Sequence, residues 1–468
     1  MKKVFSLLSA LYFLTATAAP AELLQEPAPA IMAAAAAIRD GASVTEHSAV
    51  VQERKISYTA TAGTMDVPTE DGVCEIFYTA YTRGNVEDAG SRPITFAIDG
   101  GPDSAGLWLH LGLLGPRRME TEDAPAQFPP TLIDNAYSIL DMTDLVFIDP
   151  VGTGYSRAPE GDGAAGQDSG LRAVGDFIRL YVSRGSRWGS PKYIAGGSGG
   201  AARAVGLCQY LYDAYGMGLN GLMLFSPSPE GAAQPVQSGS GLSSAFSLPT
   251  CAALAWDRGI LGQDYLDMDL WDFLGEVRGF VSGEYVPALF LGRSLDAEAR
   301  EKLTERIAAY TGMEAEAVLS SGLRIDTDSF CGEVLGGQDL TPGYMDGRAA
   351  DLMFSAAANQ YFSGELGYQT DRPYLPLPAE EAAPPVALSD AISECLSENS
   401  FLKVWVLCGC YDAGAPFYGT QWLCNQVILD ESRQESLRFS CYPTGHLFWQ
   451  DEEACALFRQ EAESWYNG

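Results

Sequence analysis

One serine in the sequence stands among four glycines, directly after a short apolar run. Residues 192–200 read KYIAGGSGG, and a helical pattern begins just after Ser198. A strand, Gly-x-Ser-x-Gly and a helix in this order are typical of the sharp turn that exposes a nucleophilic serine. Glycine at positions 196 and 200 suits the crowding at such a turn, and a helix N-terminus favours a developing negative charge. We predict that Ser198 is a nucleophile; the alternative is a glycine-rich flexible loop.

A serine hydroxyl needs a base, and the chain has only three histidines. His47 lies near the N-terminus. His110 lies in the apolar segment LWLHLGLLG, where a buried structural histidine is the better interpretation. His446 follows the run LRFSCY in a loop that reads PTGH. By elimination, we predict that His446 is the base.

The acid and the oxyanion hole are predicted from order and position. Asp412 directly follows the apolar run 403–409 and lies between the serine and the histidine, in the order Ser, acid, His. A lone Asp after a strand is often only a turn former. The oxyanion-hole donors that we predict are the backbone N–H groups of Gly199 and of Gly101, in the loop DGGPDSAG. The alternative for Gly101 is an ordinary Gly-Pro turn.

These residues follow runs that are typical of strands. The predicted strands are ISYTATAGTMDV (56–67), CEIFYTAYTR (74–83), PITFAID (93–99), DLVFIDP (144–150), KYIA (192–195), GLMLF (221–225), KVWVLCG (403–409) and LRFSCY (437–442). The first two indicate an antiparallel pair, and the others are apolar on both faces, as buried parallel strands require. Helical segments separate several of them. We therefore predict an α/β fold, a doubly wound, mostly parallel sheet, whose strand ends carry the site.

The chain divides into five predicted segments. Residues 1–18 read as a signal peptide, because two lysines precede an apolar stretch and a small-residue cleavage site. Residues 19–48 are a predicted flexible leader, 49–227 the first part of the α/β core, 228–390 a largely helical cap insertion, and 391–468 the second part of the core. A helix is expected near 295–311 within the cap. The insertion is expected to cover the carboxyl edge of the sheet, and the mature protein to be secreted or periplasmic.

Composition limits the partners. The 468 residues are 47% hydrophobic, which allows a sizeable core, and their net charge of −32 disfavours nucleic acid and anionic membranes as partners. The ten cysteines are even in number, but their pairing cannot be read from the sequence. Cys408 and Cys410 lack the spacing of a zinc site, so we expect no metal and no cofactor. The oligomeric state is left open.

Several motifs together resemble the serine carboxypeptidase family, especially its bacterial branch, which has the α/β-hydrolase fold. They are GGPDSAGLWLHLGLLGPRR (100–118), DLVFIDPVGTGYSRA (144–158), YIAGGSGGAARA (193–204), LPTCAALAWDRG (248–259), LRIDTDSF (323–330), GCYDAGAPF (409–417) and YPTGHLFW (442–449). In this resemblance Ser198, Asp412 and His446 match the triad, and Gly101 and Gly199 match the oxyanion hole. It implies the release of one C-terminal residue from a peptide substrate through an acyl-enzyme.

The departures from the family concern recognition of the substrate's terminal carboxylate. The family carries Glu and an aromatic residue where this chain has Gly197 and Gly199, and many eukaryotic members have a second Glu where this chain has Leu113. The segment 99–100, implied to bind substrate, has Asp99 in place of asparagine, followed by Gly100. An ionised Asp99 would repel a carboxylate, whereas a protonated one could donate a hydrogen bond.

These departures leave two ways in which a substrate carboxylate could still be recognised, and three functions for the chain. Carboxypeptidase activity could be confined to acidic pH, or Arg117 and Arg118 could take over the clamp; exposed arginines without that role are the alternative. The first function is a serine carboxypeptidase-like hydrolase. The second keeps the triad for an esterase or acyltransferase. The third is a non-catalytic binding protein, since Asp99 and Asp103 near the oxyanion loop would oppose an oxyanion.

Overall fold

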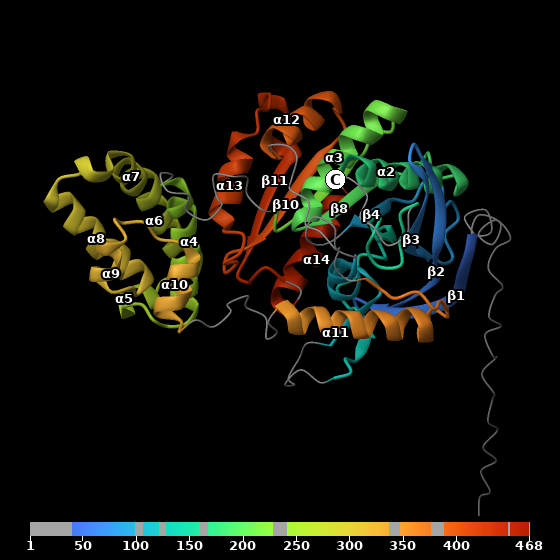
Figure 1. The fold of residues 1–468 in the computed structure, drawn as a ribbon, viewed down its shortest axis with the longest axis horizontal. Coiled ribbons are helices and arrows are strands. Elements are labelled where there is room, and N and C mark those ends of the chain that lie inside the picture. Colours follow the sequence, from blue (N-terminus) through green and yellow to red (C-terminus); the bar gives the residue numbers. More distant parts are fainter. Residues whose placement is uncertain are drawn as a thin grey trace, which may run out of the picture.

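The protein is built on one large sheet. The computed structural model describes residues 40–98, 106–120, 128–159, 167–227, 241–336, 347–375, 388–447 and 450–467. The nine strands lie in the order β1-β2-β3-β7-β4-β8-β9-β10-β11 (Figure 1). Their bounds are Asp40–Val51 (β1), Arg54–Thr69 (β2), Gly72–Arg83 (β3), Ile94–Ile98 (β4), Asp144–Ile148 (β7), Lys192–Gly197 (β8), Gly221–Phe225 (β9), Lys403–Gly409 (β10) and Leu437–Tyr442 (β11). All eight predicted strands are present.

The sheet is mostly parallel, as predicted. β7, β4, β8, β9, β10 and β11 run parallel to one another, and β1, β2 and β3 continue the sheet antiparallel from β7. Two short strands, β5 (Arg117–Met119) and β6 (Leu132–Asp134), form a second sheet that the sequence did not indicate. The fold is that of an α/β-hydrolase.

Both faces of the sheet are buried, which explains the continuous apolar runs. In β10, Val404 and Val406 belong to the hydrophobic cluster on one face, and Trp405 and Leu407 to the cluster on the other. Successive side chains alternate between the faces of a strand, so a strand covered on both sides needs apolar residues throughout.

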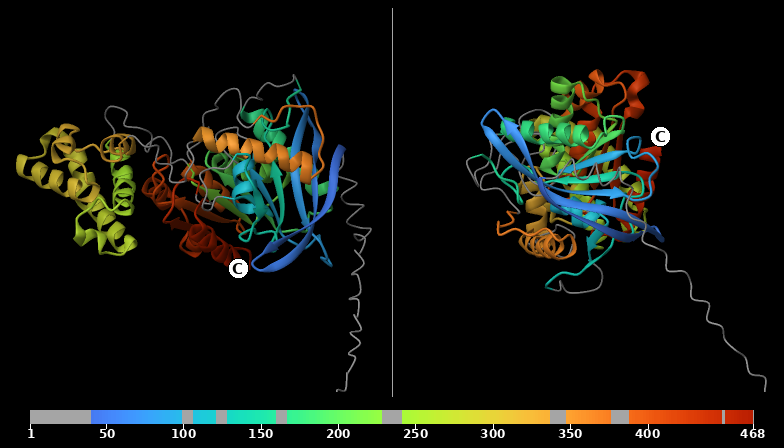
Figure 2. Two further views of the ribbon diagram at one scale, coloured as in Figure 1. Left: turned by 90° about the horizontal axis from the view of Figure 1, so that it is seen from below. Right: turned by 90° about the vertical axis from the view of Figure 1, so that its right-hand side faces the viewer.

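Helices cover the two faces, as Figure 2 shows from two further directions. One cluster includes buried residues of α2, α3, α12 and α13, and the other includes buried residues of η1, α11 and α14. The bounds on the first face are Gln167–Arg184 (α2), Gly199–Tyr215 (α3), Leu388–Glu398 (α12) and Phe417–Gln426 (α13). On the second they are Leu109–Leu114 (η1, a π-helical turn), Gly347–Gln360 (α11) and Glu452–Asn467 (α14). The sheet is therefore doubly wound. Within the described residues, no helix combines the length and the apolar character needed to cross a membrane.

The predicted leader is wrong in its last part, because residues 40–48 belong to β1. β1 pairs antiparallel with β2, and His47 lies opposite Tyr58, with ring centroids 5.6 Å apart. The backbone hydrogen bonds to β2 and this ring contact hold a segment whose alternation is weak, so tertiary pairing decides the outcome. The predicted signal peptide, residues 1–18, and residues 19–39 of the predicted leader lie outside the described residues.

The predicted cap insertion divides into two parts. Its first part is the helical group on the left of Figure 1. That group comprises Leu242–Asp257 (α4), Gln263–Leu266 (α5), Leu270–Phe280 (α6), Val281–Tyr285 (η2), Val286–Leu291 (α7), Gly292–Ser294 (η3), Ala297–Thr311 (α8), Ala315–Ser320 (α9) and Thr327–Val334 (α10). The predicted helix near 295–311 is confirmed as α8, which ends at Gly312 with φ 70°.

The second part of the predicted insertion packs on the core instead. In α11 and the following turn η4 (Tyr361–Glu365), Phe354 and Tyr361 are buried in the cluster that covers the sheet. Tyr81 of β3 donates a hydrogen bond to the Tyr361 hydroxyl (3.0 Å). The predicted boundary at residue 390 falls inside α12, which packs against α3. Sequence could not separate these helices from the cap because both kinds are amphipathic.

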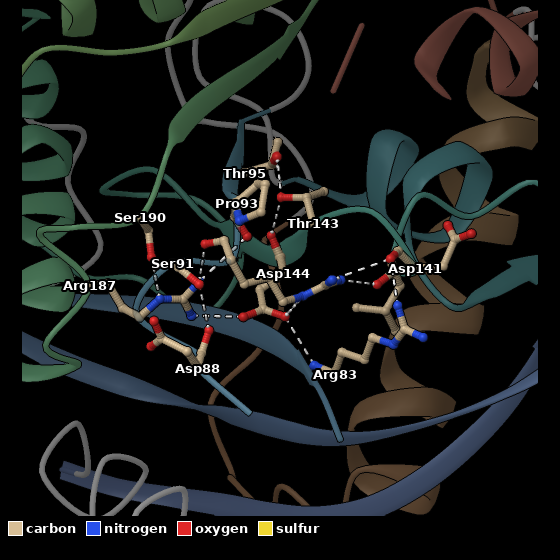
Figure 3. A network of polar contacts seen from close by, with 12 residues as sticks. Arg83, Asp88, Ser91, Pro93, Thr95, Asp141, Thr143, Asp144, Arg187 and Ser190 are labelled. Carbon is tan, nitrogen blue, oxygen red and sulfur yellow. Dashed lines mark hydrogen bonds and ion pairs between the residues drawn. The ribbon is translucent and has the colours of Figure 1, made fainter. Parts of the chain in front are cut away.

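A buried charge network fixes the amino ends of the central strands (Figure 3). Asp144, the first residue of β7, is buried with 2% of its side chain exposed. It accepts hydrogen bonds from Arg187 (2.7 Å), Arg92 (2.9 Å) and the backbone N–H of Arg83 (3.0 Å). Two guanidinium groups compensate the carboxylate, and they connect the ends of β3, β4 and β7 with the loop before β8.

We expect Asp144→Ala to lower the free energy of unfolding by about 3–5 kcal/mol, because it leaves two buried guanidinium groups without their carboxylate. Urea unfolding followed by circular dichroism measures the change. Asp213→Asn, on an exposed site of α3, is the matched control and should change stability by less than about 0.5 kcal/mol. Equal stability of the two variants would contradict the role given to the network.

Candidate active site

Ser198 occupies the sharp turn between β8 and α3. Its φ of 51° and ψ of −120° lie outside the regions that non-glycine residues prefer. Such a conformation costs on the order of 1–3 kcal/mol and persists only where the surroundings enforce it. The Ser198 N–H donates to the carbonyl oxygen of Phe225, at the end of β9 (2.7 Å). Its side chain is partly exposed, at the N-terminus of α3. This is the predicted geometry of a nucleophile.

The crowding predicted at this turn is present at Gly196. A Cβ atom there would lie 2.4 Å from the carbonyl oxygen of Gly200 and 2.9 Å from the Cα of Ala201. Both contacts are with backbone that cannot move aside. Gly196 is therefore required by the close crossing of β8 and α3, which is the physical reason for the bare sequence before the serine.

Asp412 and His446 form a hydrogen-bonded pair. Asp412 follows β10, has 1% of its side chain exposed, and its Oδ2 lies 2.7 Å from the Nδ1 of His446. Its Oδ1 accepts from the backbone N–H groups of Gly414 (3.0 Å) and Ala415 (2.8 Å). The carboxylate is thus held from both sides. His446 follows β11 with 21% of its side chain exposed, and an Nδ1–H donated to Asp412 leaves Nε2 to act as the base.

The loops that carry Asp412 and His446 are fastened to each other. The backbone N–H of Cys410 donates to Tyr442 (2.9 Å), and that of Tyr411 donates to Thr444 (2.9 Å). Gly409 permits this approach, because a Cβ there would lie 2.3 Å from the carbonyl oxygens of Thr444 and Gly445. The separation of the acid and the base is therefore set by backbone contacts of neighbouring parallel strands.

Ser226 connects the nucleophile side with the histidine side. It follows β9, its N–H donates to Leu407 of β10 (2.7 Å), and its hydroxyl donates to the carbonyl oxygen of His446 (3.4 Å). The residue before it accepts the hydrogen bond of Ser198. Sequence reasoning assigned no role to Ser226, although its position directly after an apolar run was a usable signal.

The insertion contacts the acid loop. The hydroxyl of Thr327, at the start of α10, donates to the carbonyl oxygen of Ala413 (2.9 Å), the residue after Asp412. Arg278 of α6 donates to Gln421 of α13 (3.2 Å). The helices α4–α10 therefore adjoin the loop of the predicted acid Asp412, whereas their coverage of the rest of the strand ends stays a prediction.

The structure pairs Asp412 with His446 and places Ser198 at the turn before α3, whereas other predicted site residues lie outside the described residues. Gly199 is the first residue of α3, directly after the nucleophile. The predicted Gly101 donor and the predicted substrate-binding residues Asp99 and Gly100 lie outside the described residues.

Asp149 ties the end of that glycine-rich segment to β7. Its Oδ1 accepts from the backbone N–H of Gly106 (3.2 Å) and from the Tyr374 hydroxyl (3.2 Å). Burial raises the pKa of Asp149 to about 7, although these donors oppose the shift. The predicted strand 144–150 included Asp149, which lies just past the end of β7, but no role was predicted for this residue because its partners come from distant segments.

The other histidine and the candidate clamp residues lie in structural surroundings. His110 is buried, its Nε2 lies 2.6 Å from the Tyr81 hydroxyl, and burial lowers its pKa to about 3, which confirms a structural histidine. Leu113 is buried in the apolar cluster. Arg117 pairs with Asp134 (2.6 Å) and Glu365, and Arg118 pairs with Glu452. Both arginines are thus engaged by carboxylates of this chain.

Comparisons with known proteins point to the same class. No family model matches the chain. Serine carboxypeptidase-like 10 of Arabidopsis thaliana is 23% identical over 148 residues, 31% of this chain and 33% of that protein, so the match spans about a third of the relative's length. Among solved structures, Kex1(Δ)p, a prohormone-processing carboxypeptidase from Saccharomyces cerevisiae, has a TM-score of 0.52 at 15% identity, covering 88% of this chain and 91% of that chain. A bacterial heroin esterase has a TM-score of 0.36 at 11% identity, covering 93% and 87%.

The class that fold and motifs define is thus an α/β-hydrolase similar to serine carboxypeptidases. The curated relative and the Saccharomyces structure both carry the family name or activity that the sequence motifs indicated. Membership of a bacterial branch stays a prediction, and the activity of the whole chain is a proposal.

We expect Gly196→Ala to reduce the rate at which a fluorophosphonate probe labels Ser198 by more than about a hundredfold, because a Cβ at this position displaces the turn by an ångström or more. Labelling followed by gel fluorescence measures the rate. Gly275→Ala is the matched control: its Cβ would meet no atom within 4 Å inside α6, and labelling should be unchanged. Retained labelling in Gly196→Ala would contradict the crowding argument.

Proposed function

We propose that this chain is an exported serine carboxypeptidase-like hydrolase that releases C-terminal residues from peptides. The observation that carries the proposal is the strained Ser198 at the N-terminus of α3 together with the Asp412–His446 pair on neighbouring strand ends. A nucleophile on such a turn, with an oriented histidine, is the arrangement of serine acyl transfer. The likeness to the carboxypeptidases adds support for the peptide substrate. Export rests on residues 1–18 alone.

The proposed reaction uses the described residues in fixed roles. The Ser198 Oγ attacks the scissile carbonyl carbon, and His446 Nε2 accepts the hydroxyl proton and returns it to the leaving amine. Asp412 keeps Nδ1–H oriented and stabilises the imidazolium. The N–H of Gly199 and, in the proposal, that of Gly101 stabilise the oxyanion. Water, activated by His446, then attacks the acyl-enzyme carbonyl and releases the shortened peptide.

A second candidate, an esterase or acyltransferase with the same triad, is favoured by the surroundings of the predicted clamp. Leu113 is fully buried in apolar packing, and Arg117 and Arg118 already pair with carboxylates. Leu113 carries no polar group, and the charges of both arginines are already paired within the chain. An ester without a terminal carboxylate needs no such group. A non-catalytic binding protein would retain the fold without the reactivity.

Reactivity of the serine tests whether the chain is an enzyme. We expect a fluorophosphonate to label the wild-type chain and not Ser198→Ala, and Asp412→Asn to lower the rate of hydrolysis by about 10⁴-fold, because the histidine loses its orientation. Mass spectrometry of the labelled peptide identifies the site. Ser320→Ala, on an exposed site of α9, is the control and should be labelled like the wild type. Labelling that persists in Ser198→Ala would place the nucleophile elsewhere, and no labelling of the wild type would favour a binding protein.

The residue at position 99 tests the substrate class. An aspartate is ionised at pH values well above its ordinary pKa of about 3.9. An ionised Asp99 would therefore repel a substrate carboxylate at pH 7. We expect the wild type to cleave a blocked dipeptide with a free C-terminus better at pH 4 than at pH 7. Asp99→Asn should raise kcat/KM at pH 7 by about tenfold, through a lower KM. Stopped assays resolved by mass spectrometry measure both values.

The C-terminal amide of the same dipeptide and the variant Asp103→Asn are the matched controls, and neither should respond in this way. Equal turnover of acid and amide by the wild type, with faster turnover of a simple ester, would favour the esterase. An Asp99→Asn variant that gains no affinity for the free acid at pH 7 would reject the role given to Asp99.

A further inference from the structure

Two buried thiols meet where α3 crosses α12. Cys208 of α3 and Cys395 of α12 are both buried at this crossing, and their thiols lie near each other. Two contacts beside them locate the crossing independently: the Cys395 Sγ lies 3.7 Å from the carbonyl oxygen of Val205, and Gln209 donates to the carboxylate of Glu394. The helices α3 and α12 are thus in contact both before and after Cys208 along α3.

We propose that Cys208 and Cys395 form a disulfide bond that joins α3 to α12. The structure contains no disulfide, and all ten cysteines lie in its described part. The Cys395 sulfur contacts α3 within one turn of Cys208, so the two thiols need little movement to reach the bonding distance of about 2 Å. The two thiols lose two protons and two electrons to a disulfide donor, a small-molecule or protein disulfide, which is reduced to two thiols.

The bond would form while the chain folds. Hydrogen bonding to Cys395 and burial raise the pKa of the Cys208 thiol well above its ordinary value. The thiolate is the attacking species in disulfide exchange, and a buried thiol with a raised pKa supplies very little of it. The native protein is therefore slow to gain or lose this bond.

The position of the pair gives the bond a role in the architecture. The chain between residues 208 and 395 contains all of the helices α4–α10. A disulfide that closes such a long loop removes much of the freedom of the unfolded chain. It would also join α12, which follows the insertion in the chain, to α3, the helix that begins directly after Ser198.

A second thiol contact is less suited to a bond. The thiols of Cys410 and Cys441 also lie near each other. In the parallel pair β10–β11, however, Cys441 lies opposite Cys408, and Cys410 lies two residues further along. Two residues of rise along a strand, added to the spacing between strands, place the Cα atoms beyond the usual range for a disulfide. The proposal therefore distinguishes the two pairs.

The test compares the full chain produced in an oxidising compartment with the same chain produced in a reducing cytoplasm. Each sample is denatured with an excess of iodoacetamide, digested without reductant and analysed by mass spectrometry. We expect one linked peptide pair through Cys208 and Cys395 in the oxidised sample, with neither residue alkylated, and full alkylation of both in the reduced sample. Alkylation of both residues in the oxidised sample, or links from them to other cysteines, would overturn the proposal.

Thermal melting gives a second readout that does not depend on catalytic activity. The oxidised wild type should melt several degrees above the reduced wild type. The variant with Cys208→Ala and Cys395→Ala should show no difference between the two preparations. Cys455→Ala, a buried thiol of α14 near Arg118, Asp451 and Glu452, is the matched control and should keep the difference. A difference that persists in the double variant would overturn the assignment.

Discussion

The close crossing of β8 and α3 is the constraint on which the candidate site depends. Because Gly196 has no side chain, the strand can end against the first turn of the helix. A Cβ at this position would lie only 2.4 Å from the Gly200 carbonyl oxygen. The chain must then reverse within one residue, and Ser198 takes a positive φ that only tight surroundings can maintain. The hydrogen bond from Ser198 to Phe225 fixes the turn relative to β9. The hydroxyl of Ser226, the next residue, in turn donates to the loop that carries His446.

The two ends of β7 show how the same residue type can serve opposite purposes. Asp144, at the amino end, is surrounded by guanidinium groups and fastens neighbouring strands. Asp149, just past the carboxyl end, has neutral donors and one more distant arginine, and burial outweighs them, so its pKa rises to about 7. Charge compensation is concentrated at the end of the sheet that has no proposed chemistry. Asp149, whose pKa lies near neutrality, follows the carboxyl end of β7, on the same edge of the sheet as the candidate site.

The sequence predicted the sheet well because burial on both faces leaves a continuous apolar run, which few other structures require. It indicated His446 as the base because only three histidines were available and two had surroundings unsuited to that role, and the structure pairs this histidine with Asp412. It failed at β1, where pairing with β2 compensates for a weak pattern. It also failed at Asp149, Ser226 and α11, whose roles are set by partners far away in the chain. Such contacts leave no signal in composition or periodicity, and only Ser226 had a positional one, directly after an apolar run.

The contacts of the insertion explain why substrate preference was the least readable property. Helices α4–α10 meet the core through α13, where the rings of Phe246 and Trp422 lie 5.3 Å apart, and through Thr327 beside the acid loop. Both contacts are on the Asp412 side of the site. A change of sequence in the insertion can thus displace Asp412 and its partner His446 without touching the turn at Ser198. The insertion and the turn between β8 and α3 contact the core at separate elements, so either can change in sequence while the other keeps its geometry.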